Sequence, residues 1–205
     1  MIQTAKDANN NPPHLTNAAF DIVAIAASAG GLTALIKLLS ALPAEFPAAI
    51  AIVQHLAPAH PSLMAEILNR RTDITVKQAK EGDNLTPGTA YIAPPNRHLL
   101  VKDDGTLSLS QSKLVHFLRP AADLLFESVA AIYKERAIAI VLTGTGSDGA
   151  IGVEAIKKMG GTIIVQDVKT AEFSGMPSAA IQTGNVDFIL PLDKISNALV
   201  TLVVG

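Results

Sequence analysis

The sequence alternates short apolar runs with stretches whose apolar residues recur at helical spacing, and this alternation limits the possible folds most strongly. Apolar runs of strand length occur at 22–26, 48–54, 138–142, 163–166 and 186–190. Helical patterns follow at 32–39, 61–70, 149–159, after Pro177 and at 192–203, and another lies at 121–133. Strands that alternate with helices form parallel sheets with right-handed crossovers. We therefore predict an α/β fold: a doubly wound, mostly parallel sheet with helices on both faces.

The segment between Val76 and Leu109 departs from this pattern. It contains short alternating segments and the turn pairs Pro87-Gly88, Pro94-Pro95 and Asp104-Gly105. Such pairs mark tight turns, and Asp-Gly is a strong hairpin signal. We expect a small antiparallel hairpin insertion here.

The length of 205 residues suits one hydrophobic core. Residues 1–19 are polar, with three Asn and two Pro in succession, and are expected to form a flexible tail that precedes a folded domain at 20–205. The tail lacks the apolar stretch of a secretory signal, and no apolar run reaches the roughly 18 residues of a membrane span. These features predict a cytoplasmic protein without membrane insertion.

Composition narrows the chemistry. The chain has no Cys, which excludes a thiolate nucleophile, a disulfide and a cysteine zinc site. Its net charge of −2, from 16 basic and 18 acidic residues, gives no reason to expect nucleic acid as a partner. No clustered ligand spacing suggests a metal, and we expect no cofactor.

Three polar residues directly follow predicted strands. Ser28 follows the first strand, His55 the second, and Asp148 lies in the Gly-rich turn after 138–142. The carboxyl ends of parallel strands meet at one edge of the sheet, where ligands bind. Serine needs an imidazole to take its proton and a carboxylate to orient that imidazole. We predict a catalytic triad of Ser28, His55 and Asp148.

Each of the three residues also has a structural interpretation. Ser28 and Asp148 are both suited to cap the helices that follow them, and His55 is suited to bond to backbone at a strand end. Other histidines compete for the role of base, although none directly ends a predicted parallel strand; they are His60, His98 and His116, with His14 in the tail.

Two known motifs fit only in part. Residues 26–30 (AASAG) approach the nucleophile elbow G-x-S-x-G, but the first Gly is Ala26, and the order Ser, His, Asp differs from that of α/β-hydrolases. Residues 144–146 (GTG) suggest a phosphate cradle and therefore a nucleotide or phosphosugar binder. They lack the P-loop Lys, and Asp148 beside them would repel phosphate.

Several motifs occur together in the order of one family. They are 25–31 (IAASAGG), 53–55 (VQH), 91–95 (YIAPP), 119–126 (RPAADLLF), 142–150 (LTGTGSDGA), 165–167 (VQD) and 175–177 (GMP). With these motifs, the chain from about Phe20 to Val203 resembles the catalytic domain of chemotaxis protein-glutamate methylesterases. The forms around Ser28 and Asp148 resemble most closely the methylesterase domains fused to methyltransferases.

The resemblance implies hydrolysis of glutamate γ-methyl esters on the cytoplasmic helices of chemoreceptors, with release of methanol, and deamidation of glutamines in many members. It implies Ser28 as nucleophile, His55 as base and Asp148 as its orienter. The backbone N–H groups of Ala29 and Thr145 would form the oxyanion hole.

We also expect a groove for the receptor helix near the triad. The loops that carry Arg119 and Met176 are candidates to line it, with Arg119 alternatively in an internal salt bridge to Asp123 or Glu127. The expected partner is a methylated chemoreceptor or another methylated protein, with a separate receiver or methyltransferase protein as a possible companion.

The chain departs from the common family form at Ala26, Ala29 and Thr145, and residues 1–19 leave no room for a phosphoreceiver domain. Two alternative functions therefore stay open. One is a catalytically silent binding module of the same fold, and the other is a serine hydrolase of another small ester.

Overall fold

The computed structural model describes residues 18–56 and 62–204. The expected tail falls outside this range up to residue 17, as do His14, His60 and the start of the helix predicted at 61–70. Ala19 is tied to the folded body, since its N–H donates to the carbonyl of Val203 at 3.2 Å. None of the helices in these two ranges is long and apolar enough to cross a membrane.

The centre of the molecule is a seven-stranded sheet in the order β3-β4-β2-β1-β7-β8-β9, and every pairing in it is parallel. Its strands are β1 (Ile22–Ala27), β2 (Ala49–Gln54), β3 (Thr75–Gln78), β4 (Thr89–Ile92), β7 (Ala137–Val141), β8 (Thr162–Gln166) and β9 (Phe188–Leu190). The central strands β1, β2 and β7 are buried along their whole length, because helices cover both faces. The predicted α/β class is confirmed.

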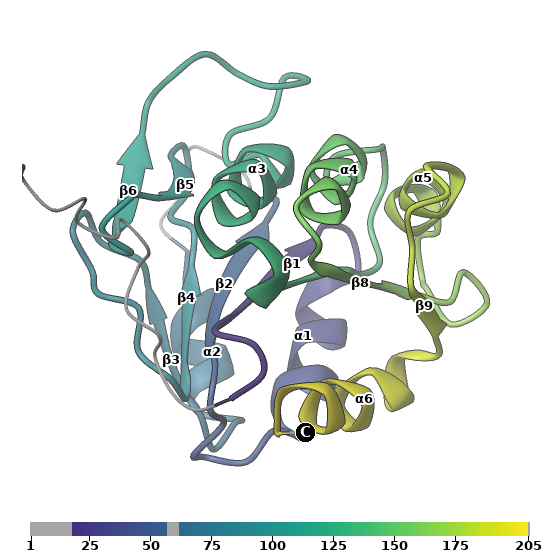
Figure 1. Cartoon of the computed structure of the whole chain (residues 1–205), viewed down its shortest axis with the longest axis horizontal. Helices are drawn as coiled ribbons and strands as arrows, with labels where there is room; N and C mark the ends of the chain where they lie inside the picture. The colour runs from purple at the N-terminus through teal and green to yellow at the C-terminus, as the bar shows by residue number, and fades with distance from the viewer. Residues whose placement is uncertain (1–17, 57–61, 205) are drawn as a thin grey trace, which may run out of the picture.

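Two layers of helices cover the sheet (Figure 1). The helices are α1 (Gly31–Leu39), α2 (Met64–Asn69), α3 (Ala122–Tyr133), α4 (Ala150–Lys158), α5 (Gly175–Gln182) and α6 (Leu192–Val204). Helices α3, α4 and α5 pack on one face, and α1, α2 and α6 pack on the other, each layer with its own apolar cluster. This is the doubly wound arrangement that the alternation predicts.

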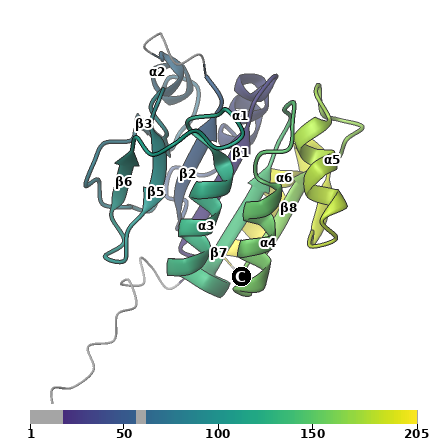
Figure 2. The same cartoon turned by 90° about the horizontal axis from the view of Figure 1, so that it is seen from above.

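The antiparallel insertion is smaller than the sequence suggests. Only β5 (His98–Val101) and β6 (Leu107–Ser110) form it, joined by a turn in which Gly105 has a φ of +79°. The earlier segments of 76–109 became β3 and β4, which join the edge of the main sheet in parallel. Their apolar side chains extend the two faces of the sheet, which short-range alternation alone does not reveal. Figure 2 shows the hairpin beside α3 at one side of the sheet.

Candidate active site

The carboxyl ends of β1, β2 and β7 lie side by side and set the frame of the site. Backbone bonding continues past the strand ends: the N–H of His55 donates to Ala27 (3.1 Å), and the N–H of Ser28 donates to Thr143 (3.0 Å). These bonds fix the first residues after all three strands relative to one another. The edge predicted to gather Ser28, His55 and Asp148 is therefore a single rigid edge.

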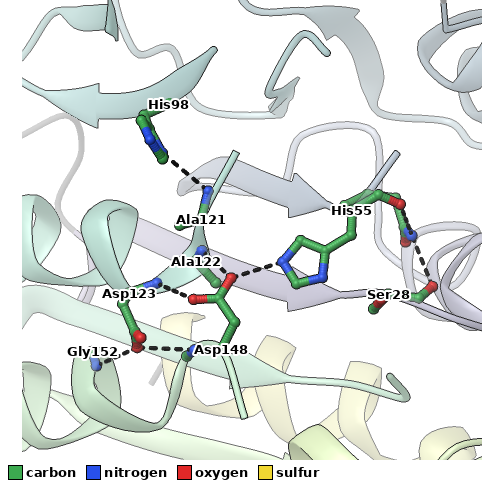
Figure 3. A network of polar contacts seen from close by, with 10 residues as sticks. Ser28, His55, His98, Ala121, Ala122, Asp123, Asp148 and Gly152 are labelled. Carbon is green, nitrogen blue, oxygen red and sulfur yellow. Dashed lines mark hydrogen bonds and ion pairs between the residues drawn. The ribbon is translucent and has the colours of Figure 1, made fainter. Parts of the chain in front are cut away.

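The imidazole of His55 contacts the carboxylate of Asp148. Its Nε2 lies 2.7 Å from Asp148 Oδ2, and the His55 side chain retains 11% of its exposure. Since an ionised carboxylate only accepts, Nε2 carries the proton in this contact and Nδ1 is left as the acceptor. Figure 3 shows Ser28 on the side of the ring that faces away from Asp148. The alternative of a His55 held only by backbone groups is wrong.

Asp148 is held by more than the imidazole. It is 3% exposed, and its carboxylate also accepts from the N–H of Ala122 at 2.6 Å and of Asp123 at 3.1 Å. Burial by itself raises the pKa of Asp148, but the bonds from His55 and these two N–H groups outweigh it and hold the pKa below its usual value. Asp148 is therefore ionised at neutral pH.

Those two N–H groups belong to the first turn of α3, so Asp148 caps a helix distant in sequence. The alternative in which Asp148 caps the helix after it is wrong, because the N-cap of α4 is Gly149 and has no side-chain cap. The amino end of α4 is satisfied by Asp123, whose Oδ1 accepts from Gly149 (2.9 Å) and Gly152 (2.8 Å). Each aspartate therefore caps the helix that adjoins the other (Figure 3).

Asp123 is 2% exposed, and its Oδ2 is buried without a hydrogen-bond partner among the described residues. Burial raises its pKa to about 6, helped by the nearby charge of Asp148, while the N–H groups of Gly152 and Gly149 act in the opposite direction. The sequence suggests Asp123 only as a partner for Arg119. Its place in the first turn of a helix, between Ala122 and Leu124, was the available sign of burial.

Ser28 lies in a tight turn between β1 and α1. The N-cap of α1 is Gly30, with a φ of 75°, so the alternative in which Ser28 caps this helix is wrong. The Ser28 hydroxyl makes no hydrogen bond to the residues that the structure describes. Gly144 allows the opposite loop to approach, since a Cβ there would lie 2.8 Å from Ser28 Cβ.

The two predicted oxyanion donors are open. The N–H groups of Ala29 and Thr145 have no acceptor within the described part of the chain. The loops that carry them are braced by Thr143, whose hydroxyl donates to Ala29 O at 3.0 Å and accepts from Phe173 N at 2.9 Å. This leaves two N–H donors free at the edge that holds Ser28.

The two residues expected at the substrate groove both serve the protein's own loops. Arg119 donates to Asn96 Oδ1 through Nε and Nη2, and to the carbonyls of Gln111 and Ser112 through Nη1. It therefore binds neither Asp123 nor Glu127. Met176 is 1% exposed and packs beneath Gly144, which favours a supporting role for its side chain.

His98 and His116 differ sharply. His98 is fully buried, accepts from the N–H of Ala121 through Nδ1 (3.2 Å) and contacts the carbonyl of Lys113 through Nε2 (3.1 Å). Burial lowers the pKa of His98, which keeps it neutral and suited to anchor the segment that leads into α3. His116 is exposed on that segment.

Comparisons with known proteins agree on one family. The family model described as CheB methylesterase matches residues 23–199. The crystal structure of the Thermotoga maritima CheB methylesterase catalytic domain superposes with a TM-score of 0.86 at 39% identity, covering 89% of this chain and 98% of that one.

Curated relatives lead to the same family. Proteins named protein-glutamate methylesterase/protein-glutamine glutaminase from Methanosarcina mazei and Pyrococcus horikoshii are each 41% identical over 89% and 88% of this chain. The chain spans 52% and 50% of their lengths. A shorter relative from Leptospira interrogans is 40% identical, and the chain covers 95% of it.

Proposed function

This chain belongs to the CheB methylesterase family, and we propose that it is a serine esterase that hydrolyses glutamate γ-methyl esters on the cytoplasmic helices of chemoreceptors. The observation that carries the proposal is the 2.7 Å contact between His55 and Asp148 at the strand edge that holds Ser28. Phosphate binding has no comparable support, because the buried carboxylate of Asp148 and the bond from Gly144 N to Phe173 O oppose an anion cradle.

Acylation begins at Ser28. Its Oγ attacks the γ-carbonyl carbon of the ester while its proton passes to Nδ1 of His55, the nitrogen that Asp148 leaves free. The tetrahedral intermediate then breaks the bond to the methoxy oxygen, and the proton on His55 passes to that oxygen. Methanol leaves, and the glutamyl group stays on Ser28 as an ester.

Deacylation repeats these steps with water. His55 takes a proton from a water molecule, the hydroxide attacks the acyl carbon, and the Ser28 oxygen leaves and regains the proton. Asp148 stays ionised and stabilises the imidazolium in both halves of the reaction, which agrees with its lowered pKa. The products are a glutamate carboxylate and methanol.

The N–H groups of Ala29 and Thr145 bind the oxyanion in both intermediates. One such donor contributes about 10² to 10³ in rate in comparable sites. The same steps on a glutamine side chain would release ammonia, so deamidation requires no further residue. No step requires a metal or a cofactor.

The expected partner is a methylated chemoreceptor helix in the cytoplasm, with Arg119 and Met176 supporting the loops beside the groove. A separate receiver or methyltransferase protein would supply regulation. The Methanosarcina mazei and Pyrococcus horikoshii relatives are proteins of which this chain spans about half, and other methylated proteins are substrates to be tested.

Labelling with a fluorophosphonate probe, followed by peptide mapping, tests the proposal. Label should appear on Ser28 in the wild type, and it should be absent from Ser28→Ala and at least 10²-fold slower in His55→Ala. Methanol release from a methylated chemoreceptor fragment should follow the same order. A folded wild-type protein that neither takes up label nor releases methanol would favour a silent binding module.

A further inference from the structure

The two predicted oxyanion donors share one structural device. Each N–H belongs to a trans peptide group whose carbonyl oxygen, on the opposite side of the peptide, accepts hydrogen bonds from the protein. In the Gly144–Thr145 peptide, Gly144 O accepts from Met176 N at 2.9 Å. In the Ser28–Ala29 peptide, Ser28 O accepts from Gly31 N at 2.8 Å and from Gln54 Nε2 at 2.7 Å.

A hydrogen bond to the carbonyl of a peptide group also fixes the direction of its N–H. A trans peptide is planar, and its C=O and N–H point in opposite directions, so a group that fixes one fixes the other. A hydrogen bond to the carbonyl also polarises the peptide and strengthens the N–H as a donor. Gln54 is the one side chain among the described residues that donates to either of these carbonyls.

We propose that Gln54 is a positioning residue that aims the Ala29 N–H at the oxyanion and holds it in register with the base; this rests on the proposed esterase function. The same Nε2 donates to the carbonyl of His55 at 3.1 Å. One amide group therefore bonds both to the turn that contains Ser28 and to the backbone of His55, the proposed base. The two carbonyl acceptors assign this end of the side chain as nitrogen, because an oxygen there would face two oxygens.

The arrangement has a cost that points to function. Gln54 is 4% exposed, and its Oε1 is buried without a hydrogen-bond partner among residues 18–56 and 62–204. A buried unpaired carbonyl destabilises a fold, so the amide at this position is not explained by stability alone. The amide fits only because residue 31 is glycine, where a Cβ would lie 1.9 Å from Oε1.

Two substitutions disturb the amide independently. Gln54→Met keeps the length of the side chain and removes both donors. Gly31→Ala forces the amide away from Ser28 O without changing Gln54, and residue 31 has no positive φ that would oppose alanine. Tyr91→Phe is the matched control: Tyr91 is another fully buried side chain that donates to a backbone carbonyl, that of Asn84 at 2.6 Å, and it bonds neither donor peptide.

The experiment measures kcat and KM for methanol release from a methylated chemoreceptor fragment, the rate of fluorophosphonate labelling, and chemical denaturation of each variant. Gln54→Met should lower kcat and the labelling rate about tenfold, with KM within twofold and the variant still folded. The loss stays below the 10² to 10³ of a deleted donor because Gly31 N still holds Ser28 O. Gly31→Ala should match it, and the double variant should lose little more.

Equal kcat in the wild type and folded Gln54→Met would overturn the proposal, as would equal losses in Gln54→Met and Tyr91→Phe. Fully multiplicative losses in the double variant would also overturn it, because the two changes would then act separately. A wild type that labels at Ser28 but releases no methanol would refute the proposed substrate alone, and the labelling rates would still decide the role of Gln54. A wild type that neither labels at Ser28 nor releases methanol would refute both the esterase function and the proposed role of Gln54.

Discussion

The site has a base side and a nucleophile side that are built in opposite ways. On the base side, His55 and the amino ends of α3 and α4 surround Asp148, which accepts from an imidazole and two backbone N–H groups. On the nucleophile side, the Ser28 hydroxyl and the N–H groups of Ala29 and Thr145 have no partners within the described residues.

In the proposed mechanism, the difference follows from when each side carries charge. Asp148 would be charged throughout the cycle, so its buried carboxylate must be satisfied in the resting protein. The oxyanion exists only during turnover, and donors that bind it more tightly than the substrate carbonyl accelerate the reaction. The nucleophile side therefore requires unpaired N–H donors, those of Ala29 and Thr145, on loops that other hydrogen bonds hold in place.

The largest expected effect comes from breaking the base side at its centre. Asp148→Asn should lower kcat about 10³- to 10⁴-fold, because an amide facing Nε2 favours the wrong imidazole tautomer. Methanol release under saturating substrate measures it. Asp21→Asn is the control, since Asp21 is equally buried but pairs with Arg136 away from the site. Similar losses of kcat in both variants would show that burial of an aspartate, not its place beside His55, matters.

A smaller effect should follow from Asp123, one step further from His55. Asp123→Ala leaves the N–H groups of Gly149 and Gly152 without their acceptor and loosens the loop that carries Asp148. We expect kcat to fall about 10- to 100-fold and stability to fall by about 1–3 kcal/mol. Asp123→Asn keeps an acceptor and should retain kcat within about fivefold. Equal kcat in the Ala variant and the wild type would show that the cap that Asp123 makes on α4 does not help to position Asp148.

On the nucleophile side, Gly30→Ala should lower kcat about tenfold. Residue 30 has a φ of +75°, and a Cβ there would lie 2.8 Å from Glu172 Oε2 and 3.2 Å from Thr143 Oγ1. The turn must shift, and we expect a stability loss of about 1–2 kcal/mol. Steady-state kinetics and thermal unfolding test this. Unchanged kcat with lowered stability would mean that the nucleophile side tolerates movement.

Outside both sides, Arg119→Ala should raise KM for a receptor fragment about three- to fivefold and leave kcat unchanged. Its donors hold the segment at 111–112 and Asn96, which we propose lie beside the groove for the receptor helix. Arg119→Lys, which cannot hold these acceptors together, should behave like the alanine variant. A fall in kcat instead would show that the segment held by Arg119 also affects the positions of His55 and Asp148.

The smallest effect concerns stability alone and tests the charge on Asp123. Its pKa of about 6 in the folded protein lies above the ordinary 3.8, so its ionisation disfavours the fold. The free energy of unfolding of the wild type should therefore fall by about 1–2 kcal/mol relative to that of Asp123→Asn as the pH rises from about 4 to 6, because solvent screening reduces the full effect. Urea denaturation across this range measures it. A constant difference would show that Asp123 does not titrate there.

The strand-end residues were predictable, and their supports were not. Ser28, His55 and Asp148 follow strands that the apolar runs mark clearly, and parallel topology brings such ends together. The sequence marks Gln54 only as the last residue of a strand, which it is, and Asp123 only as a candidate for an internal salt bridge to Arg119. Both side chains are buried, and the partners of Asp123 lie 26 and 29 positions along the chain.

The sequence by itself determined the alternating α/β architecture, the family and the three residues at the strand ends, because periodicity and motif order are local properties of the chain. Tertiary structure alone decided that β3 and β4 extend the main sheet, that Asp148 and Asp123 exchange caps, and that Gln54 grips the Ser28 carbonyl. These features depend on which backbone donors and acceptors remain unpaired once the elements pack. Burial decides that, since an unpaired polar group is costly only where water is excluded.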